Sequence, residues 1–223
     1  MNIAIIPARS GSQRIKNKNI KLFSKKPIIY WTIKILKESN LFEAIAVSSD
    51  SKKILEFSKK YGSDILIKRP KRLSDSKTST HSAIKHAIKF LNLKSQNNLN
   101  IFCVYPCNPL LQISDLKKSL LELKKNKNKF IFPVSSFSNY MNNLIILNKS
   151  KNVKYVKNYY KKKYFFDAGQ FYLANLSTWK KFSNIHKNGH CIKIPEWRTV
   201  DINYPSDWKK AEAIFRYLNN VSR

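Results

Sequence analysis

The sequence predicts a single α/β domain built on a doubly wound, mostly parallel sheet. Short apolar runs alternate with longer segments whose apolar residues recur at helical spacing. Strands and helices in alternation are typical of a parallel sheet with helices on both faces. The length of 223 residues fits one medium-sized domain, and an apolar content of 43% supplies its core. We therefore expect residues 1–223 to form one domain.

The first part of the chain shows the alternation most clearly. Continuous apolar runs, typical of buried parallel strands, predict strands at 2–6, 44–48, 65–67, 101–105 and 130–134. Between them we expect a helix from Pro27, a helix capped by Asp50 or Ser51 and ended by Gly62, a helix near 83–91, and one opened by Ser114 and Asp115. In such a sheet, ligands bind beyond the carboxyl ends of the strands.

The pattern changes between about residues 135 and 164. Two short apolar runs, at 144–147 and 153–156, predict a β-hairpin or arm that leaves the core. The chain then returns to the core. We expect a strand at 170–174, a helix at 177–182, a strand at 191–194 and a final helix capped by Ser206.

The charge of the chain is unusual for an enzyme. Lys and Arg number 43 against 13 Asp and Glu, a net charge of +30. Such a field attracts polyanions and small anionic substrates alike, but lysines on solvated helix faces explain most of it. Three unclustered cysteines, Cys103, Cys107 and Cys191, form neither a disulfide framework nor a zinc site. No targeting segment or membrane span is visible, so we expect a cytoplasmic protein.

The loop after the first strand is the strongest candidate site. Gly11 permits a tight turn, and the hydroxyls and amides of Ser10 and Ser12 can surround an anion. Arg9 and Arg14 offer forked donors to phosphate oxygens. The spacing is neither that of a Walker loop nor that of a dinucleotide fingerprint. On residue types alone, a phosphate-binding loop and a solvated basic loop both remain open.

The segment 5–19 resembles the opening signature of the cytidylyltransferases that activate nonulosonic (sialic-type) acids, I-I-P-A-R-G-G-S-K-R-I-P-x-K-N. Matches follow in order along the chain. They are the Arg-Pro and Leu-Ser-Asp of 69–75, the loop 105–110, and the ending with Asp-Ile-Asn at 201–203 and Asp-Trp at 207–208. The segment 167–172, Asp-Ala-Gly-Gln-Phe-Tyr, is similar to an element of the members that act on pseudaminic acid.

The resemblance implies a Rossmann-like nucleotidyltransferase fold and a reaction of CTP with a nine-carbon sugar acid, here pseudaminic acid, giving a CMP-sugar and pyrophosphate for cell-surface or flagellar glycans. It also implies Mg²⁺ and a homodimer, with the arm at about 135–164 reaching the partner. The implied catalytic residues are Arg9, Arg14, Lys18 and Asp201. The implied CTP contacts are Ala8, Arg9, Ser10, Gly11, Ser12, Lys18, Asn19, Arg69, Thr80 and Tyr105. Asp167, Gln170 and Tyr172 would contact the sugar, and Asp201 and Asn203 would hold the metal.

Two residues depart from the family pattern. Gln13 stands where the family has lysine, and Asn203 replaces the second aspartate of the metal pair. Three alternatives therefore stay open: a relative acting on sialic, legionaminic or 3-deoxy-octulosonic acid, a family member weakened in catalysis, and a basic nucleic-acid-binding protein without catalysis. No nucleic-acid motif supports the last. The four histidines form no ligand set and are assigned no role.

Overall fold

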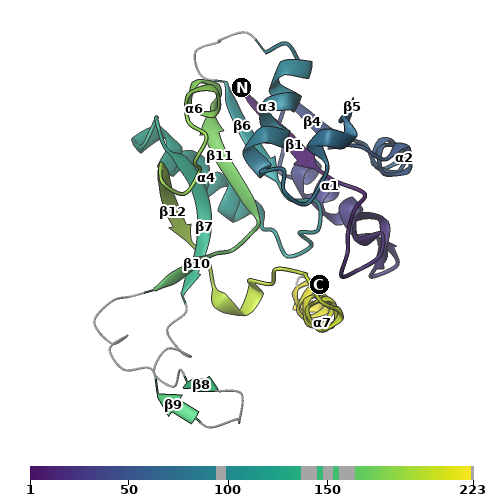
Figure 1. Ribbon diagram of the computed structural model, residues 1–223, viewed down its shortest axis with the longest axis vertical. Coiled ribbons are helices and arrows are strands. Elements are labelled where there is room, and N and C mark those ends of the chain that lie inside the picture. The colour runs from purple at the N-terminus through teal and green to yellow at the C-terminus, as the bar shows by residue number, and fades with distance from the viewer. Residues whose placement is uncertain (94–98, 137–144, 148–152, 156–163, 222–223) are drawn as a thin grey trace.

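The computed structural model describes residues 1–223 except 94–98, 137–144, 148–152, 156–163 and 222–223. An eight-stranded sheet forms its centre, with the strand order β10-β7-β11-β6-β1-β4-β5 and with β12 paired to β7 (Figure 1). Its strands are β1 Asn2–Pro7, β4 Ala44–Ser49, β5 Ile65–Lys68, β6 Asn100–Val104, β7 Phe130–Ser136, β10 Phe165–Asp167, β11 Phe171–Asn175 and β12 Gly189–Lys193. The expected α/β fold with a mostly parallel sheet is confirmed.

Helices follow most of these strands. The α-helices are α1 Ile28–Glu38, α2 Lys52–Lys60, α3 Thr80–Phe90, α4 Ile113–Lys125, α6 Leu176–Lys181 and α7 Pro205–Val221. Three short 3-10 helices, η1 Lys18–Ile20, η2 Lys71–Leu73 and η3 Glu196–Arg198, lie in connecting segments. Within the described residues, no helix is long and apolar enough to cross a membrane.

The parallel half of the sheet has its switch point at β1. This strand pairs in parallel with β4 on one side and with β6 on the other, so the chain winds outward in both directions from it. A crevice at the carboxyl ends of the strands results from such a reversal. The loops after β1, β5 and β6 therefore leave the sheet at one common edge.

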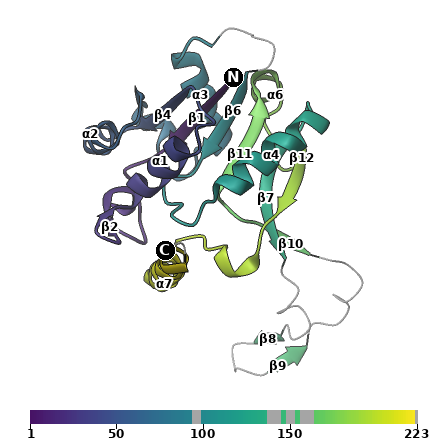
Figure 2. The ribbon, with the colours of Figure 1, turned by 180° about the vertical axis from the view of Figure 1, so that it is seen from behind.

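The side chains of the strands alternate between two cores. Ala4 and Ile6 of β1 join one apolar cluster with α1, α2 and α4, whereas Ile3 and Ile5 join another with α3 and α6. Figures 1 and 2, taken from opposite sides, show α1 and α4 on one face and α3 and α6 on the other. A third cluster packs α7 against Phe23, next to the loop after β1. Both faces of the sheet are thus covered, as the continuous apolar runs require.

A broken antiparallel strand completes the other half of the sheet. Asp167 of β10 lies opposite Val134 of β7, and Leu173 of β11 lies opposite Ile131. Between these two pairs, the five residues 168–172 lie opposite the two residues 132–133, so the longer segment bulges out of the ladder. Gly169 sits in this bulge with a φ of +61°, a conformation that glycine adopts without steric cost.

Several local expectations differ from the structure. The final helix begins at Pro205 rather than behind a Ser206 cap, because proline fits the first helical turn. Helix α4 begins at Ile113, and no side chain caps it. Ser51, not Asp50, caps α2. The short pair β2 Leu22–Phe23 and β3 Lys26–Pro27, and strand β10, were not predicted, since two- and three-residue strands leave little periodic signal.

The expected arm is described only in part. Strands β8 Ile145–Leu147 and β9 Val153–Tyr155 form an antiparallel pair separate from the central sheet (Figure 1). The predicted hairpin is present there, and the rest of the segment 137–163 lies outside the described residues. Strand β7 continues to Ser136, and β10 begins at Phe165 directly opposite it. The segment therefore leaves and rejoins the sheet at one place.

A buried ion pair holds the chain that leads into the candidate site. Arg198, in η3, donates two hydrogen bonds to the carboxylate of Asp115 in α4, at 2.6 and 2.8 Å. Both side chains are less than a tenth exposed. Breaking a buried pair leaves one charge without compensation.

We expect Asp115→Asn to lower the free energy of unfolding by about 3–5 kcal/mol, because the buried Arg198 guanidinium would lose its counter-charge. Denaturant titration measures the change. Glu38→Gln is the control, since Glu38 forms an exposed ion pair with Lys34 at 3.2 Å and should cost about 0.5 kcal/mol or less. Equal losses in the two variants would contradict a structural role for the Asp115–Arg198 pair.

Candidate active site

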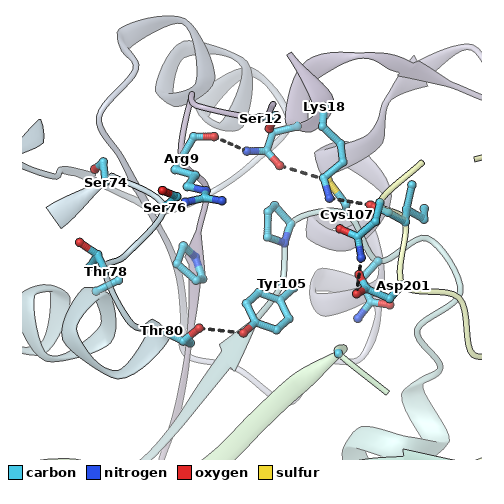
Figure 3. Close-up of a pocket in the computed structure, with 18 of the residues that line it drawn as sticks. Arg9, Ser12, Lys18, Ser74, Ser76, Thr78, Thr80, Tyr105, Cys107 and Asp201 are labelled. Atoms are coloured by element: carbon cyan, nitrogen blue, oxygen red, sulfur yellow. Dashed lines mark hydrogen bonds between the residues drawn. The ribbon is translucent and has the colours of Figure 1, made fainter. Parts of the chain in front are cut away.

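A cavity of about 580 Å³ opens at the carboxyl ends of β1, β5 and β6. The segment 200–203 and the bulge between β10 and β11 close its other side. Figure 3 shows polar side chains from these separate segments around the opening, with Arg9 and Thr80 on one side and Lys18 and Asp201 on the other. The cavity lies where the switch point of the sheet predicts a ligand site.

Hydrogen bonds hold the loop after β1 to Asp50, the residue that follows β4. The backbone N–H and hydroxyl of Ser10 both donate to the carboxylate of Asp50, at 2.9 and 2.5 Å. The N–H of Ser12 donates to the Ser10 carbonyl at 2.8 Å. At the start of the loop, an Arg9 guanidinium nitrogen donates to the Asp75 carbonyl at 2.6 Å. The loop is therefore held in one conformation on its outer side.

Arg69 adds a buried cation near the half-buried Arg9. Its side chain is 4% exposed, and its Nε donates to the Ser74 hydroxyl at 3.0 Å. Burial lowers the pKa of Arg69, with a further lowering from the charge of Arg9, while Asp50 acts in the opposite direction. An anion between the two guanidinium groups would relieve this repulsion. The geometry therefore favours a negatively charged ligand at this end of the cavity.

Lys18 and Asn19 tie the far end of the same loop to other segments. The Lys18 ammonium donates to the carbonyl of Ile202 at 2.6 Å, which connects the loop with the segment that carries Asp201. The Asn19 amide donates to the Arg9 carbonyl at 2.8 Å and accepts from the Cys107 thiol at 3.1 Å. Burial raises the pKa of Cys107 to about 12, so the thiol stays protonated as a donor.

Two tyrosines line the inner wall. The Tyr105 hydroxyl is 2.7 Å from the Thr80 hydroxyl, and the Tyr172 hydroxyl donates to the Asp167 carboxylate at 2.6 Å. Burial raises the pKa of Tyr105 to about 12 and raises that of Tyr172 further, with the Asp167 charge adding to the second shift. Both phenols are therefore neutral hydrogen-bond donors near pH 7.

The segment before α7 carries one carboxylate into the cavity. The Asn203 amide donates to Asp201 Oδ2 at 2.5 Å, and the backbone N–H groups of Asn203 and Tyr204 donate to Asp207 at 2.9 and 2.7 Å. Across the opening, the Arg14 guanidinium lies 5.0 Å from the Tyr204 ring centroid. Among the described residues, no three His, Cys, Asp or Glu side chains cluster as a self-sufficient metal site.

The structure brings most of the predicted site residues together. Those that line the cavity are Arg9, Ser12, Arg14, Lys18, Asn19, Arg69, Thr80, Tyr105, Asp167, Tyr172, Asp201 and Asn203. Ser10 and Gly11 line a separate shallow hollow next to it, and Ala8 is buried with its N–H bonded to Ser48. Gln170 is also buried, and its carbonyl accepts from the Tyr105 N–H and from the Asn108 amide.

Sequence reasoning missed part of the cavity wall. The additional residues come from the loops after β5 and β6 and include Ser74, Asp75, Ser76, Thr78, Ser79, Cys107 and Asn108. Their signal was their place directly after a parallel strand, because the carboxyl ends of such strands converge on the ligand. The family matches at 69–75 and 105–110 already contain Ser74, Asp75, Cys107 and Asn108, but from these two loops only Arg69, Thr80 and Tyr105 are assigned to the site from the sequence.

The chain matches a family model described as Cytidylyltransferase over residues 3–217. A pseudaminic acid cytidylyltransferase of Campylobacter jejuni (strain 81-176) is 32% identical in an alignment of length 223 that covers 96% of this chain and 96% of that one. A CMP-N,N'-diacetyllegionaminic acid synthase of Legionella pneumophila is 31% identical over 61% of this chain and 58% of its own. A solved CMP:2-keto-3-deoxy-manno-octonic acid synthetase, complexed with CTP, shares the fold with a TM-score of 0.73 at 14% identity, covering 97% of this chain and 99% of that one.

We expect iodoacetamide at pH 8 to alkylate exposed Cys191 well before Cys103 and Cys107. The thiolate is the nucleophile, and burial raises the pKa of both inner thiols far above this pH. Mass spectrometry of the labelled peptides measures each rate, with urea-unfolded protein as the control in which all three react. Alkylation of Cys107 as fast as Cys191 in the folded protein would contradict a protonated thiol that donates to Asn19.

Proposed function

This chain belongs to the cytidylyltransferase family, and from that premise we propose that it activates pseudaminic acid. CTP and the sugar acid would give CMP-pseudaminic acid and pyrophosphate. The observation that carries the proposal is one cavity with cationic side chains at one end and the Asp167–Tyr172 pair at the other. A triphosphate and a polyhydroxylated acid need those two environments side by side.

The cationic end suits the triphosphate. Arg9, Arg14 and Lys18 come from the loop after β1, and Arg69 from the loop after β5. In the proposed reaction the anomeric hydroxyl oxygen attacks the α-phosphorus, and the bond to the bridging oxygen breaks. Pyrophosphate departs with the bonding electrons, and the hydroxyl proton passes to solvent water. The protein's part is alignment and neutralisation of the departing charge, which fixed cations provide.

The residues around Asp201 fit a magnesium ion held jointly with phosphates. Mg²⁺ prefers oxygen ligands and commonly uses one or two carboxylates together with substrate phosphate oxygens. Asp201 supplies one carboxylate at the cavity wall, and Asn203 donates to it and so fixes its orientation. When bound, Mg²⁺ would neutralise charge on the phosphates. In this proposal Asp201 is a protein ligand and Asn203 orients it. The metal contact expected for the Asn203 amide oxygen stays a prediction.

The opposite end suits the sugar. Asp167 and Tyr172 line the cavity with a carboxylate and a phenol, which can hydrogen-bond hydroxyl and amide groups. The buried Gln170 stabilises this wall, because its backbone carbonyl accepts hydrogen bonds from the Tyr105 N–H and the Asn108 side-chain amide. The sugar contact expected for the Gln170 side chain stays a prediction. The homodimer, the reach of the arm and a cytoplasmic location also belong to the proposal.

Pyrophosphate release from CTP and Mg²⁺ tests the substrate. We expect the highest kcat/KM with pseudaminic acid in a panel that also contains sialic, legionaminic and 3-deoxy-octulosonic acids. Reactions without sugar and without CTP are the controls. A higher kcat/KM with another sugar would overturn the sugar assignment, and no release with any sugar would sink the proposed function.

We expect Arg9→Ala to lower kcat/KM by roughly 10²–10³-fold, because a preorganised cation at the phosphates would be lost. Lys21→Ala is the matched control, since Lys21 is exposed, lies in the same segment and packs on Trp208 away from the cavity. Circular dichroism of both variants checks the fold. Near-normal turnover of a folded Arg9→Ala protein would show that the triphosphate binds elsewhere.

A further inference from the structure

An exposed histidine lies behind the sugar end of the cavity. His186 follows α6, in the segment that leads into β12. Its Nε2 is 2.7 Å from Asp167 Oδ2, and its side chain is 63% exposed against 23% for Asp167. Asp167 lines the cavity, whereas His186 does not. His186 therefore reaches the site only through the carboxylate that it contacts.

Asp167 is almost fully occupied by donors from the protein itself. The Gly169 N–H donates to Oδ1 at 2.8 Å, and the Tyr172 hydroxyl and His186 contact Oδ2 at 2.6 and 2.7 Å. A carboxylate offers about four acceptor positions, two on each oxygen. Donors among the described residues use three of them and leave one position on Oδ1. This position is an acceptor for an N–H or O–H group at the cavity wall.

Two groups meet the same oxygen of Asp167 from opposite sides. The single hydroxyl hydrogen of Tyr172 goes to Asp167 Oδ2 from the cavity wall. His186 Nε2 meets this oxygen from the exposed side.

His186 is held in place despite its exposure. The rings of Phe132 and Tyr172 meet it edge-on, at centroid distances of 5.3 and 6.0 Å. The Gly189 N–H donates to its carbonyl at 3.0 Å, and a Cβ at Gly189 would lie only 2.9 Å from that carbonyl oxygen. Phe132, Tyr172 and Asp167 belong to three different strands. The imidazole is therefore fixed by the sheet rather than free in solvent.

We propose that His186 is a positioning residue for the sugar acid. By fixing Asp167 Oδ2, it leaves the free acceptor on Oδ1 facing a hydroxyl or amide N–H of the bound sugar. The inference rests on the proposed function, since it assigns the sugar to this end of the cavity. His186 does not touch the reacting atoms, so its loss weakens sugar binding and leaves the chemical step intact.

Steady-state kinetics of His186→Ala and His186→Gln test the inference with pseudaminic acid, CTP and Mg²⁺. For His186→Ala we expect the KM for the sugar to rise roughly tenfold, as for the loss of one hydrogen bond to a charged group. The KM for CTP and kcat at saturating sugar should stay within about twofold. His186→Gln should restore most of the sugar affinity, because its amide can donate from nearly the same place.

His190→Ala is the matched control. His190 is also exposed and also contacts a carboxylate, that of Glu122 at 3.3 Å, but neither residue lines the cavity. Its kinetics should equal those of the wild type. An unchanged sugar KM in His186→Ala, with an active wild type, would overturn the inference and leave the proposed function standing. Equal rises in both KM values, or no rescue by glutamine, would show a merely structural role. A wild type inactive with every sugar would end both.

Discussion

The site depends on one constraint, the parallel pairing of β1 with two neighbours at once. Pro7 lies opposite Ser48 of β4, and Ile5 lies opposite Cys103 of β6. A slip of one residue would exchange the two buried faces of β1, and the closely packed cores on the two sides accept different side chains, Ala4 and Ile6 on one and Ile3 and Ile5 on the other. The register therefore fixes where the chain leaves the sheet. This register alone places Arg9 near the residues that follow β5 and β6. The hydrogen bond of Arg9 to Asp75 is not needed to bring it there.

The antiparallel strand β11 brings residues to the site from its beginning, whereas the parallel strands do so from their ends. Because it runs antiparallel to β6, with Phe171 opposite Val104, the residues before Phe171 lie beside those after Val104. Asp167 and Gly169 thus arrive at the same edge as Tyr105, although they enter their strand rather than leave it. Because some strands end at this edge and β11 begins there, the cavity has two chemically different ends. The cations come from loops after parallel strands. The carboxylate of Asp167 comes from the last residue of β10, just before the bulge that leads into β11.

Much of the fold could be predicted from the sequence because its signals are local. The apolar run at 2–6 predicts a strand and the helical spacing in 83–91 predicts a helix. The structure confirms both, as β1 and α3. The candidate cavity residues came from position after strands and from the resemblance to a family. The bonds that shape the site were out of reach. Ser10 meets Asp50, and Asp167 meets His186, across 40 and 19 residues, so these contacts follow from strand register and not from spacing.

The place where β7 and β10 meet has a consequence for how such a protein can change. Ser136 and Phe165 are paired, so the sheet already closes the ends of the segment between them. Closing a longer or shorter loop there alters the free energy only slowly with length. Insertions are tolerated best at such surface positions, where no core strand has to move. The fold can therefore exchange this segment as a module while the register of the central strands stays unchanged.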